Sequence, residues 1–227
     1  MLSTHISIAR ASCPSCLRPA RACICHCVHP CPSDVELLIL QHPEEVGHAK
    51  NTARLLHLCV PGSRISIGET FDAHALNDLL HGPWQEGAVP KHSVLLYPET
   101  AIDPQVTLTA PPALPLRWLE QPQRLRLVLL DGTWRKSRKM LYSNPLLQQL
   151  PRIGLSAVAS RRYAIRKAHA EHQLSSFEAA AYALAQLQGW DSTHPYLIQW
   201  LATFDSVIHQ HQQLERLGRS TRSQSTT

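Results

Sequence analysis

The sequence lacks any apolar run long enough to cross a membrane. No stretch approaches the roughly 20 consecutive apolar residues that a transmembrane helix needs, and residues 1–12 lack the apolar block of a secretory signal peptide. We therefore expect a cytoplasmic protein that makes no membrane contact.

Three common active-site motifs are also absent. Without Gly-x-Gly-x-x-Gly or a Walker loop, neither a dinucleotide-binding domain nor a nucleoside triphosphatase is indicated. The lack of Gly-x-Ser-x-Gly removes the usual indication of a serine hydrolase. No internal repeat is found, so the function has to be sought in other residues.

Cysteine is scarce outside one short segment, because six of the seven cysteines lie between Cys13 and Cys31. In a reducing compartment such a cluster is more typical of a metal site than of disulfides. Cys13-x-x-Cys16 and Cys23-x-Cys25 supply four thiolates, which suit tetrahedral zinc. We expect structural zinc, since four protein ligands leave no open position for catalysis.

The ligand set has alternatives within the same segment. Free or redox-active thiols are the interpretation without a metal. Four further side chains could each replace one of the four cysteines as ligand: His26, Cys27, His29 and Cys31.

Length and charge indicate the domain organisation and the kind of partner. A chain of 227 residues suits one domain with an appendage. We divide it into a Cys-rich zinc-binding module (1–33), a main domain (34–217) and a disordered tail (218–227) rich in Ser, Thr, Arg and Gln. The net charge of +5 favours an anionic partner, and we expect a monomer.

Apolar runs alternate with helix-like segments along the main domain. Strands are predicted at 35–40, 63–67, 93–97, 127–130 and 155–159, and helices at 49–58, 72–80, 134–142, 145–150, 175–187 and 193–217. Residues 104–123 contain five prolines and are predicted to form a surface loop. The alternation indicates an α/β fold with a mainly parallel sheet and helices on both faces.

The most informative stretch is Leu127–Leu130 with the residues that follow it. An unbroken apolar run is typical of a parallel strand that is covered on both faces. The run ends at Asp131-Gly132, Thr133 is a candidate helix N-cap, and a helix without Gly or Pro follows. In a parallel sheet the ligand crevice lies beyond the carboxyl ends of the strands, which makes Asp131, Gly132, Thr133 and Trp134 candidate site residues.

Other interpretations compete with this one. Asp-Gly is common in hairpins, but no alternating second strand follows it, so we discount a hairpin. Asp131 could simply cap the helix, and Trp134 could belong to the core. The next cations could contact an anionic ligand or form a solvated face: Arg135, Lys136, Arg138 and Lys139.

Three further features lie near the ends of predicted helices or strands. Residues 160–167 hold four cations and an aromatic side chain, which suits phosphate contact with base stacking but equally suits an exposed basic loop: Arg161, Arg162, Tyr163, Arg166 and Lys167. Ser175-x-x-Glu178 predicts a capping box. His42 follows the first strand, where a histidine bonded to backbone is expected.

Taken together, these motifs resemble the DTW-domain family of tRNA-uridine aminocarboxypropyltransferases, which is named for Asp-x-Thr-Trp. The resemblance runs from Cys13 to about Leu187. It rests on the two cysteine pairs and on His42-Pro43-x-Glu45, Asn51-Thr52-Ala53-Arg54-Leu55-Leu56, Leu96-Tyr97-Pro98, Leu129–Trp134, Tyr163-x-Ile165-Arg166 and Glu178-Ala179. Ser176, where the family usually has Thr, and the extra Cys27 and Cys31 depart from the pattern.

The resemblance implies a SPOUT-like fold with a knotted C-terminal part that binds S-adenosylmethionine. The implied reaction moves the 3-amino-3-carboxypropyl group of that co-substrate to N3 of a tRNA uridine, at variable-loop position 47, and releases methylthioadenosine. An RNA methyltransferase of the same fold and a non-catalytic zinc-ribbon RNA-binding protein are the rival hypotheses.

The resemblance also assigns roles to residues. Asp131 is the hypothesised general base or N3 acceptor, Thr133 orients the substrates and Trp134 stacks on a base or supports the loop. Arg135 or Arg166 would hold the carboxylate of the methionine arm. The implied co-substrate contacts are Leu96, Tyr97, Pro98, Leu130, Gly132 and Arg166. The implied RNA contacts are Arg135, Lys136, Arg138, Lys139, Arg161, Arg162, Tyr163 and Lys167.

Overall fold

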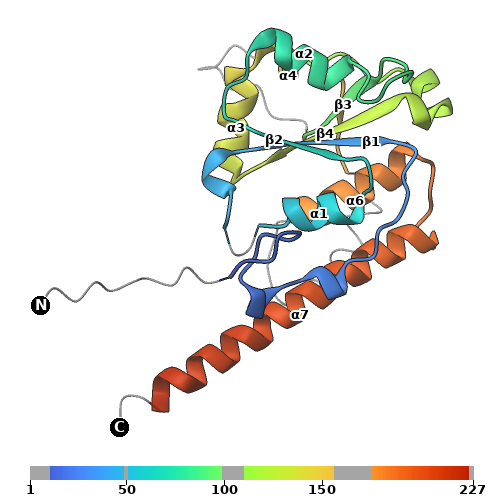
Figure 1. Cartoon of the computed structure of the whole chain (residues 1–227). Helices are drawn as coiled ribbons and strands as arrows, with labels where there is room; N and C mark the ends of the chain where they lie inside the picture. Colours follow the sequence, from blue (N-terminus) through green and yellow to red (C-terminus); the bar gives the residue numbers. More distant parts are fainter. Residues whose placement is uncertain (1–10, 49–50, 99–109, 156–174, 225–227) are drawn as a thin grey trace, which may run out of the picture.

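The centre of the protein is a five-stranded sheet. The computed structural model describes residues 11–48, 51–98, 110–155 and 175–224. All neighbouring strands pair in parallel, in the order β2-β1-β4-β3-β5 (Figure 1). The strands are β1 (Glu36–Gln41), β2 (Arg64–Ile67), β3 (His92–Leu96), β4 (Leu125–Asp131) and β5 (Arg152–Ile153). The predicted parallel α/β architecture is therefore confirmed.

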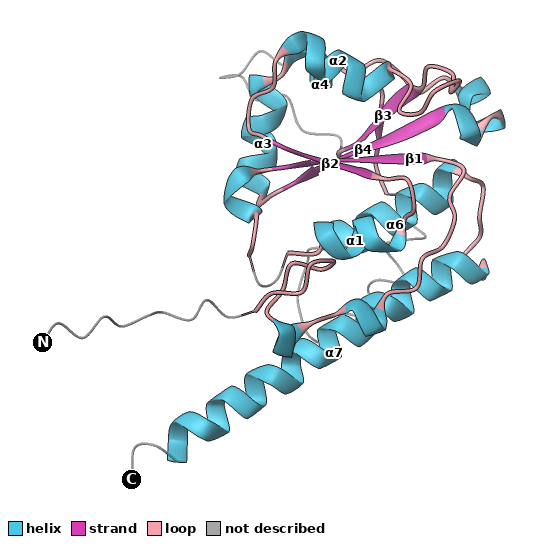
Figure 2. Ribbon diagram, viewed as in Figure 1, coloured by secondary structure: helices cyan, strands magenta, loops and turns pink. Residues whose placement is uncertain are grey.

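Helices cover both faces of the sheet (Figure 2). Leu37 and Ile39 of β1 belong to the core shared with α1 (Ala53–Cys59), α6 (Ser176–Leu187) and α7 (Pro195–Gln224). The alternate residues Leu38 and Leu40 pack with α2 (Ala73–His81), α3 (Trp134–Ser143) and α4 (Pro145–Gln148). All seven residues of β4 are buried. This double coverage explains why β1 and β4 appear in the sequence as apolar runs without alternation.

The chain leaves β1 and β4 in opposite directions. From β1 it continues to β2 at one edge of the sheet, whereas from β4 it continues to β5 at the other edge. Gln41 and Asp131, the last residues of the two strands, pair in register. In open α/β sheets, ligand crevices form where strand order reverses in this way.

Short polar side chains cap α2, α3 and α6. Thr133 caps α3 and accepts a hydrogen bond from the Lys136 N–H, and Asp72 caps α2. Ser175 and Glu178 form the predicted capping box of α6. Asp131 is therefore not the cap of α3, which removes one of its alternative roles.

Two predictions differ from the structure. The described residues contain an edge strand at Arg152–Ile153 that was not predicted; of the strand predicted at 155–159, Leu155 is not in a strand and 156–159 fall outside the described residues. Two residues at a sheet edge, paired only with Leu95 and Leu96, are too few for an apolar pattern. Helix α7 continues to Gln224, so the tail predicted to be disordered from Gly218 is helical over most of its length. A single glycine costs a helix only about 1 kcal/mol.

The Cys-rich segment (residues 11–31) shares the main core. Cys16, Ile24, Cys27 and Cys31 are buried with residues of α1, α6 and α7. Its only regular elements are two short 3-10 turns, η1 (Ala20–Ala22) and η2 (Cys25–Cys27). We infer that this segment depends on the helices beside it for burial.

Two further observations concern the whole fold. Among the described residues, no helix combines the length and apolar character needed to cross a membrane. The resemblance implies a knot in the C-terminal part of the chain, where residues 156–174 lie outside the described residues, so the knot stays a prediction.

Candidate active site at the ends of β1 and β4

Asp131 lies at the point where the strand order reverses, held by two amide side chains. Its Oδ2 accepts hydrogen bonds from Gln41 Nε2 at 3.0 Å and from Asn51 Nδ2 at 2.7 Å. The Asp131 backbone carbonyl accepts from the His42 N–H at 2.9 Å. Two donors on one oxygen fix the plane of the carboxylate, and Oδ1 receives no hydrogen bond from the described residues.

A small hollow opens in front of this carboxylate. It has a volume of about 220 Å³. We call it the acid hollow, and its lining residues are Glu45, Asn51, Thr52, Asp131, Gly132, Ser175 and Ser176. Asp131 is only 3% exposed, so a ligand that reaches its carboxylate has to enter this hollow.

Gly132 allows the chain to turn tightly beside the acid. A Cβ atom added at Gly132 would lie 3.0 Å from Lys136 Cβ and 3.5 Å from His42 Cβ. The first contact would require Lys136 to move, whereas the second is an ordinary van der Waals contact. Gly132 therefore lets the loop after β4 pack closely against α3.

A larger cavity of about 540 Å³ lies beyond β3, β4 and β5, next to the acid hollow. We call it the apolar cavity. It is lined by Leu96, Tyr97, Pro98, Leu129, Leu130, Trp134, Ser137, Ile153, Gly154, Leu155, Ser176 and Ala179. Ser176 at the start of α6 lines both hollows, so two ligands placed in them would lie side by side.

Trp134 forms one wall of the apolar cavity. Its ring stacks on Tyr97 with centroids 5.3 Å apart and planes 16° apart. The side chain is 51% exposed, so the alternative of a core residue is wrong. Tyr97 is buried, and this burial raises the pKa of its phenol. The pair offers a flat, partly open aromatic surface of the kind on which a nucleobase stacks.

The predicted site residues are thus divided between the two hollows. The structure places Leu96, Tyr97, Pro98, Leu130 and Trp134 in the apolar cavity and Asp131 and Gly132 in the acid hollow. Thr133 is exposed and caps α3. The predicted contacts Arg161, Arg162, Tyr163, Arg166 and Lys167 lie outside the described residues.

The cations of α3 are in different environments. Lys136 Nζ lies 2.7 Å from Glu45 and 3.1 Å from Glu44, and Glu45 contributes most to raising the pKa of Lys136. Lys139 lies 2.8 Å from Glu69. Arg138 Nε donates to the Tyr142 hydroxyl at 2.9 Å, whereas Arg135 is exposed. Lys136 and Lys139 therefore join α3 to the loops after β1 and β2.

His42 belongs to the same network. Its Nδ1 accepts from the Glu44 N–H at 3.2 Å, as expected for a histidine bonded to backbone, while its Nε2 lies 2.9 Å from Glu69 Oε2. Lys139 first, and His42 second, lower the pKa of Glu69.

The four predicted cysteines converge. The sulfur atoms of Cys13, Cys16, Cys23 and Cys25 all lie within 4.8 Å of one another. Cys13 and Cys25 are 3.6 Å apart, and Cys16 and Cys23 are 3.8 Å apart. A zinc ion with Zn–S bonds of about 2.3 Å requires sulfur atoms about 3.8 Å apart. The cluster therefore has the size and donor set to hold a metal ion.

Three of the four alternative ligands make contacts outside the cluster. Cys27 Sγ donates to Gln210 Oε1 at 3.8 Å, and Cys31 Sγ donates to the His29 carbonyl at 3.5 Å. His29 Nδ1 lies 2.9 Å from the Cys27 carbonyl. Backbone N–H groups of Cys16 and Ser15 lower the pKa of Cys13 to about 6, which favours the thiolate that binds metals.

Sequence reasoning missed the two amides that hold Asp131. Gln41 falls just after the strand predicted at 35–40, and Asn51 appears only within the motif Asn51-Thr52-Ala53-Arg54-Leu55-Leu56. Their position is predictable in principle, because parallel strands end at the same edge of a sheet. The missing information was that β1 and β4 are neighbours.

Comparison with known proteins gives consistent similarities. The family model described as DTW domain matches residues 10–209. The tRNA-uridine aminocarboxypropyltransferase 2 of Drosophila melanogaster is 31% identical over 219 residues, which cover 92% of this chain and 81% of the relative. No solved structure gives a significant match.

Two further relatives are covered less completely. The tRNA-uridine aminocarboxypropyltransferase 2 of Macaca fascicularis is 28% identical over 89% of this chain, which spans 65% of that relative. The tRNA-uridine aminocarboxypropyltransferase A of Arabidopsis thaliana is 30% identical over 61% of this chain and 53% of the relative. The chain is thus similar to these proteins but shorter than they are.

Proposed function

This chain belongs to the DTW domain family, and we propose that it is an enzyme that modifies a uridine in tRNA. The proposed reaction transfers the 3-amino-3-carboxypropyl group of S-adenosylmethionine to N3 of the uridine, at position 47 of the variable loop. The names of the relatives support the transferase class and the tRNA substrate.

One observation carries the proposal: the buried carboxylate of Asp131, which lines a hollow of about 220 Å³, has one oxygen tied to two amides and the other without a hydrogen bond from the described residues. Uracil N3 bears a weakly acidic proton, and a general base must lie within hydrogen-bond reach of the proton that it takes. In the proposed step, Asp131 Oδ1 takes the N3 proton while N3 attacks the methylene carbon bonded to sulfur. The C–S bond breaks, and its electron pair leaves with neutral methylthioadenosine.

The apolar cavity would hold the sulfonium co-substrate. Its adenine would stack on Trp134, and Leu96, Tyr97, Pro98 and Leu130 would exclude water from the reacting carbon. Ser176 lines both this cavity and the acid hollow, so the two lie side by side. Such placement is the main requirement, because a sulfonium is already a strong electrophile.

The product depends on which carbon faces N3. Transfer of the aminocarboxypropyl group requires the methionine arm to point from the apolar cavity toward Asp131. We propose that Arg135 or Arg166 holds its carboxylate, since a guanidinium binds a carboxylate through two hydrogen bonds. Arg135 follows Trp134 at the start of α3 and is exposed there.

The tRNA would approach over the same edge of the sheet. We propose phosphate contacts for the cations of α3 and for residues 161–167. Arg135 is the α3 cation with the most freedom to do so, because Lys136 and Lys139 are already paired with glutamates. The cysteine cluster would hold zinc in a structural role, with all four coordination positions filled by protein sulfur.

The decisive experiment is to incubate purified protein with unmodified tRNA and S-adenosylmethionine, digest the RNA and weigh the nucleosides. An aminocarboxypropyl increment on uridine is the expected result. A methyl increment would keep the co-substrate but make the protein a methyltransferase. Bound tRNA without any increment would favour a non-catalytic RNA-binding protein.

A further inference from the structure

Two arginines join the Cys-rich segment to the loop that holds the acid. Arg18 Nη2 donates to the Asn51 carbonyl at 3.2 Å, and Arg54 Nε donates to the Ser15 carbonyl at 2.8 Å. Arg18 lies between the two cysteine pairs, and Ser15 lies within the first pair. Each side therefore supplies one guanidinium and one carbonyl, which makes the junction reciprocal.

Asn51 connects this junction to Asp131. Its side-chain Nδ2 donates to Asp131 Oδ2 at 2.7 Å, and its Oδ1 accepts from Gln41 Nε2 at 3.2 Å. The same Oδ1 accepts from the Ala53 N–H at 2.9 Å, at the first residue of α1. A displacement of the Asn51 backbone would therefore be passed to the carboxylate and to the start of α1 together.

We propose that Arg18 is a positioning residue: it fastens the four-cysteine cluster to Asn51, so that metal at the cysteines sets the orientation of the Asp131 carboxylate. This inference rests on the proposed function of Asp131. A metal ion would hold both cysteine pairs in one geometry, and small segments of this kind take much of their folding free energy from the metal. The geometry of Arg18 would follow from that of the cluster.

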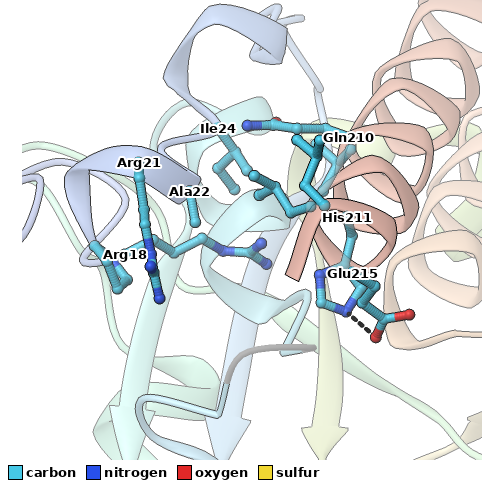
Figure 3. Close-up of a pocket in the computed structure, with 11 residues that line it drawn as sticks. Arg18, Arg21, Ala22, Ile24, Gln210, His211 and Glu215 are labelled. Atoms are coloured by element: carbon cyan, nitrogen blue, oxygen red, sulfur yellow. Dashed lines mark ion pairs between the residues drawn. The ribbon is translucent and has the colours of Figure 1, made fainter. Parts of the chain in front are cut away.

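The Cys-rich segment has a second attachment, which does not involve Asn51. Gln210 of α7 donates from Nε2 to the Cys23 carbonyl at 3.0 Å and accepts from Cys27 Sγ at 3.8 Å. A cavity of about 510 Å³ lies between the segment and α7. Figure 3 shows Arg18 and Arg21 on its Cys-rich side and Gln210 and His211 on α7. The two attachments can therefore be broken separately.

The first experiment compares Arg18→Met with Gln210→Leu in metal-loaded protein. We expect both variants to keep the metal content of the wild type. Arg18→Met should lower kcat about tenfold or more, because small displacements of reacting groups have large effects, with a smaller change in KM for tRNA. Arg18→Lys should recover part of kcat, and Gln210→Leu should keep it. Equal losses in Arg18→Met and Gln210→Leu, or an unchanged kcat in Arg18→Met, would overturn the inference.

A double variant tests the route through Asn51. If Arg18 acts through Asn51, the Arg18→Met/Asn51→Ala protein should be no slower than Asn51→Ala alone, since the effects of coupled residues do not add. If the decreases in kcat of the two single variants multiply in the double variant, Arg18 acts by another route.

Hydrogen exchange measures the local stability of the Asn51 loop and the start of α1 without relying on catalytic activity. The amides of residues 51–56 should exchange faster in Arg18→Met, and in wild-type protein after metal removal, than in the loaded wild type or in Gln210→Leu. Unchanged exchange would contradict the inference even in an active enzyme. An inactive wild type with the expected exchange pattern would instead contradict the proposed function alone.

Discussion

Asp131 shows how one residue acquires a role from its neighbours. Its carboxylate is buried, yet both groups that touch Oδ2 are neutral amides and not cations. Amides orient a carboxylate without neutralising its charge, which suits the role of general base proposed for Asp131. This arrangement differs from a structural ion pair, in which a neighbouring cation would neutralise the carboxylate.

Replacing Asp131 by Asn tests its role as base. Asn keeps the shape of Asp and can still accept from Gln41 and Asn51, but it cannot take a proton. We expect kcat to fall about 10²- to 10⁴-fold, with binding of S-adenosylmethionine and tRNA retained. Turnover and binding should be measured for Asp131→Asn and for the control variant Asp72→Asn. Asp72 is the exposed N-cap of α2, and Asn caps a helix as well as Asp does. Near-normal turnover would remove Asp131 as the base.

Trp134 is the residue through which the apolar cavity would recognise adenine. Stacking of a base on an aromatic ring contributes about 1–3 kcal/mol, so Trp134→Ala should weaken S-adenosylmethionine binding about 10- to 100-fold. Trp134→Phe should recover much of this loss. Trp118→Ala is the matched control in calorimetry, because Trp118 stacks on His92 at the first residue of β3, away from the cavity. Unchanged affinity in Trp134→Ala would limit this ring to packing on Tyr97.

At the scale of elements, the starts of α3 and α6 enclose the site. Helix α6 begins with the capping box of Ser175 and Glu178, and Ser176 follows at the wall shared by the two hollows. Helix α3 begins at Trp134 and is tied to the loops after β1 and β2 by Lys136 and Lys139. The site thus depends on where these two helices begin.

Removing the cap of α6 should destabilise the protein. Ser175→Ala leaves the Glu178 N–H without its side-chain acceptor, at a cost of about 1 kcal/mol. For a chain of this size the expected decrease in Tm is about 2–4 °C. Ser206→Ala removes a hydroxyl from the exposed face of α7 and serves as control. Equal Tm changes in both variants by calorimetry would contradict a capping role.

The Glu69 network should give stability a dependence on acid pH. The pKa of Glu69 is lowered from 4.5, chiefly by Lys139 and then by His42. A carboxyl with a lowered folded-state pKa stabilises the fold above its unfolded pKa, and this contribution is lost as pH falls through the folded-state value. The Tm difference between wild type and Glu69→Gln should therefore shrink below pH 4.5.

The exposed Glu86→Gln is the control for this pH series. Its Tm difference from the wild type should stay constant over the same pH range. A Glu69→Gln difference that persists at acid pH would point to packing instead of charge.

At the scale of the whole molecule, the Cys-rich segment is part of the main core. Cys16 and Ile24 are buried with residues of α1, α6 and α7; Arg18 joins the segment to the loop before α1, and Gln210 joins it to α7. Loss of the metal should therefore loosen more than the segment itself.

Metal content separates the ligands from the other cysteines. Cys16→Ser should abolish binding of about one zinc ion per chain and lower Tm, because the four sulfur atoms form one closed set. Cys31→Ser should keep the metal even if it loses stability, since Cys31 is buried and donates to the His29 carbonyl. Elemental analysis and calorimetry measure both effects. Metal retained in Cys16→Ser would contradict this ligand set.

Local sequence was enough to predict the elements whose burial or capping produces a pattern in neighbouring residues. Strands buried on both faces appear as apolar runs, which identified β1 and β4, and the caps of α3 and α6 lie beside the helices that they begin. The cysteine ligands lie within thirteen residues, so their spacing indicated the cluster correctly. The position of Asp131 at the end of a strand was predictable, because a strand followed by a helix is a local pattern.

Only the tertiary structure decided how these local pieces act together. The amides that hold Asp131 come from residues 90 and 80 positions away, and Lys136 is paired with Glu45 across 91 positions. The edge strand β5 was missed because two residues carry no period, and its pairing with β3 defines it. Contacts of this kind depend on the order and register of the strands, which arise from packing between distant segments and leave no periodic signal in the chain.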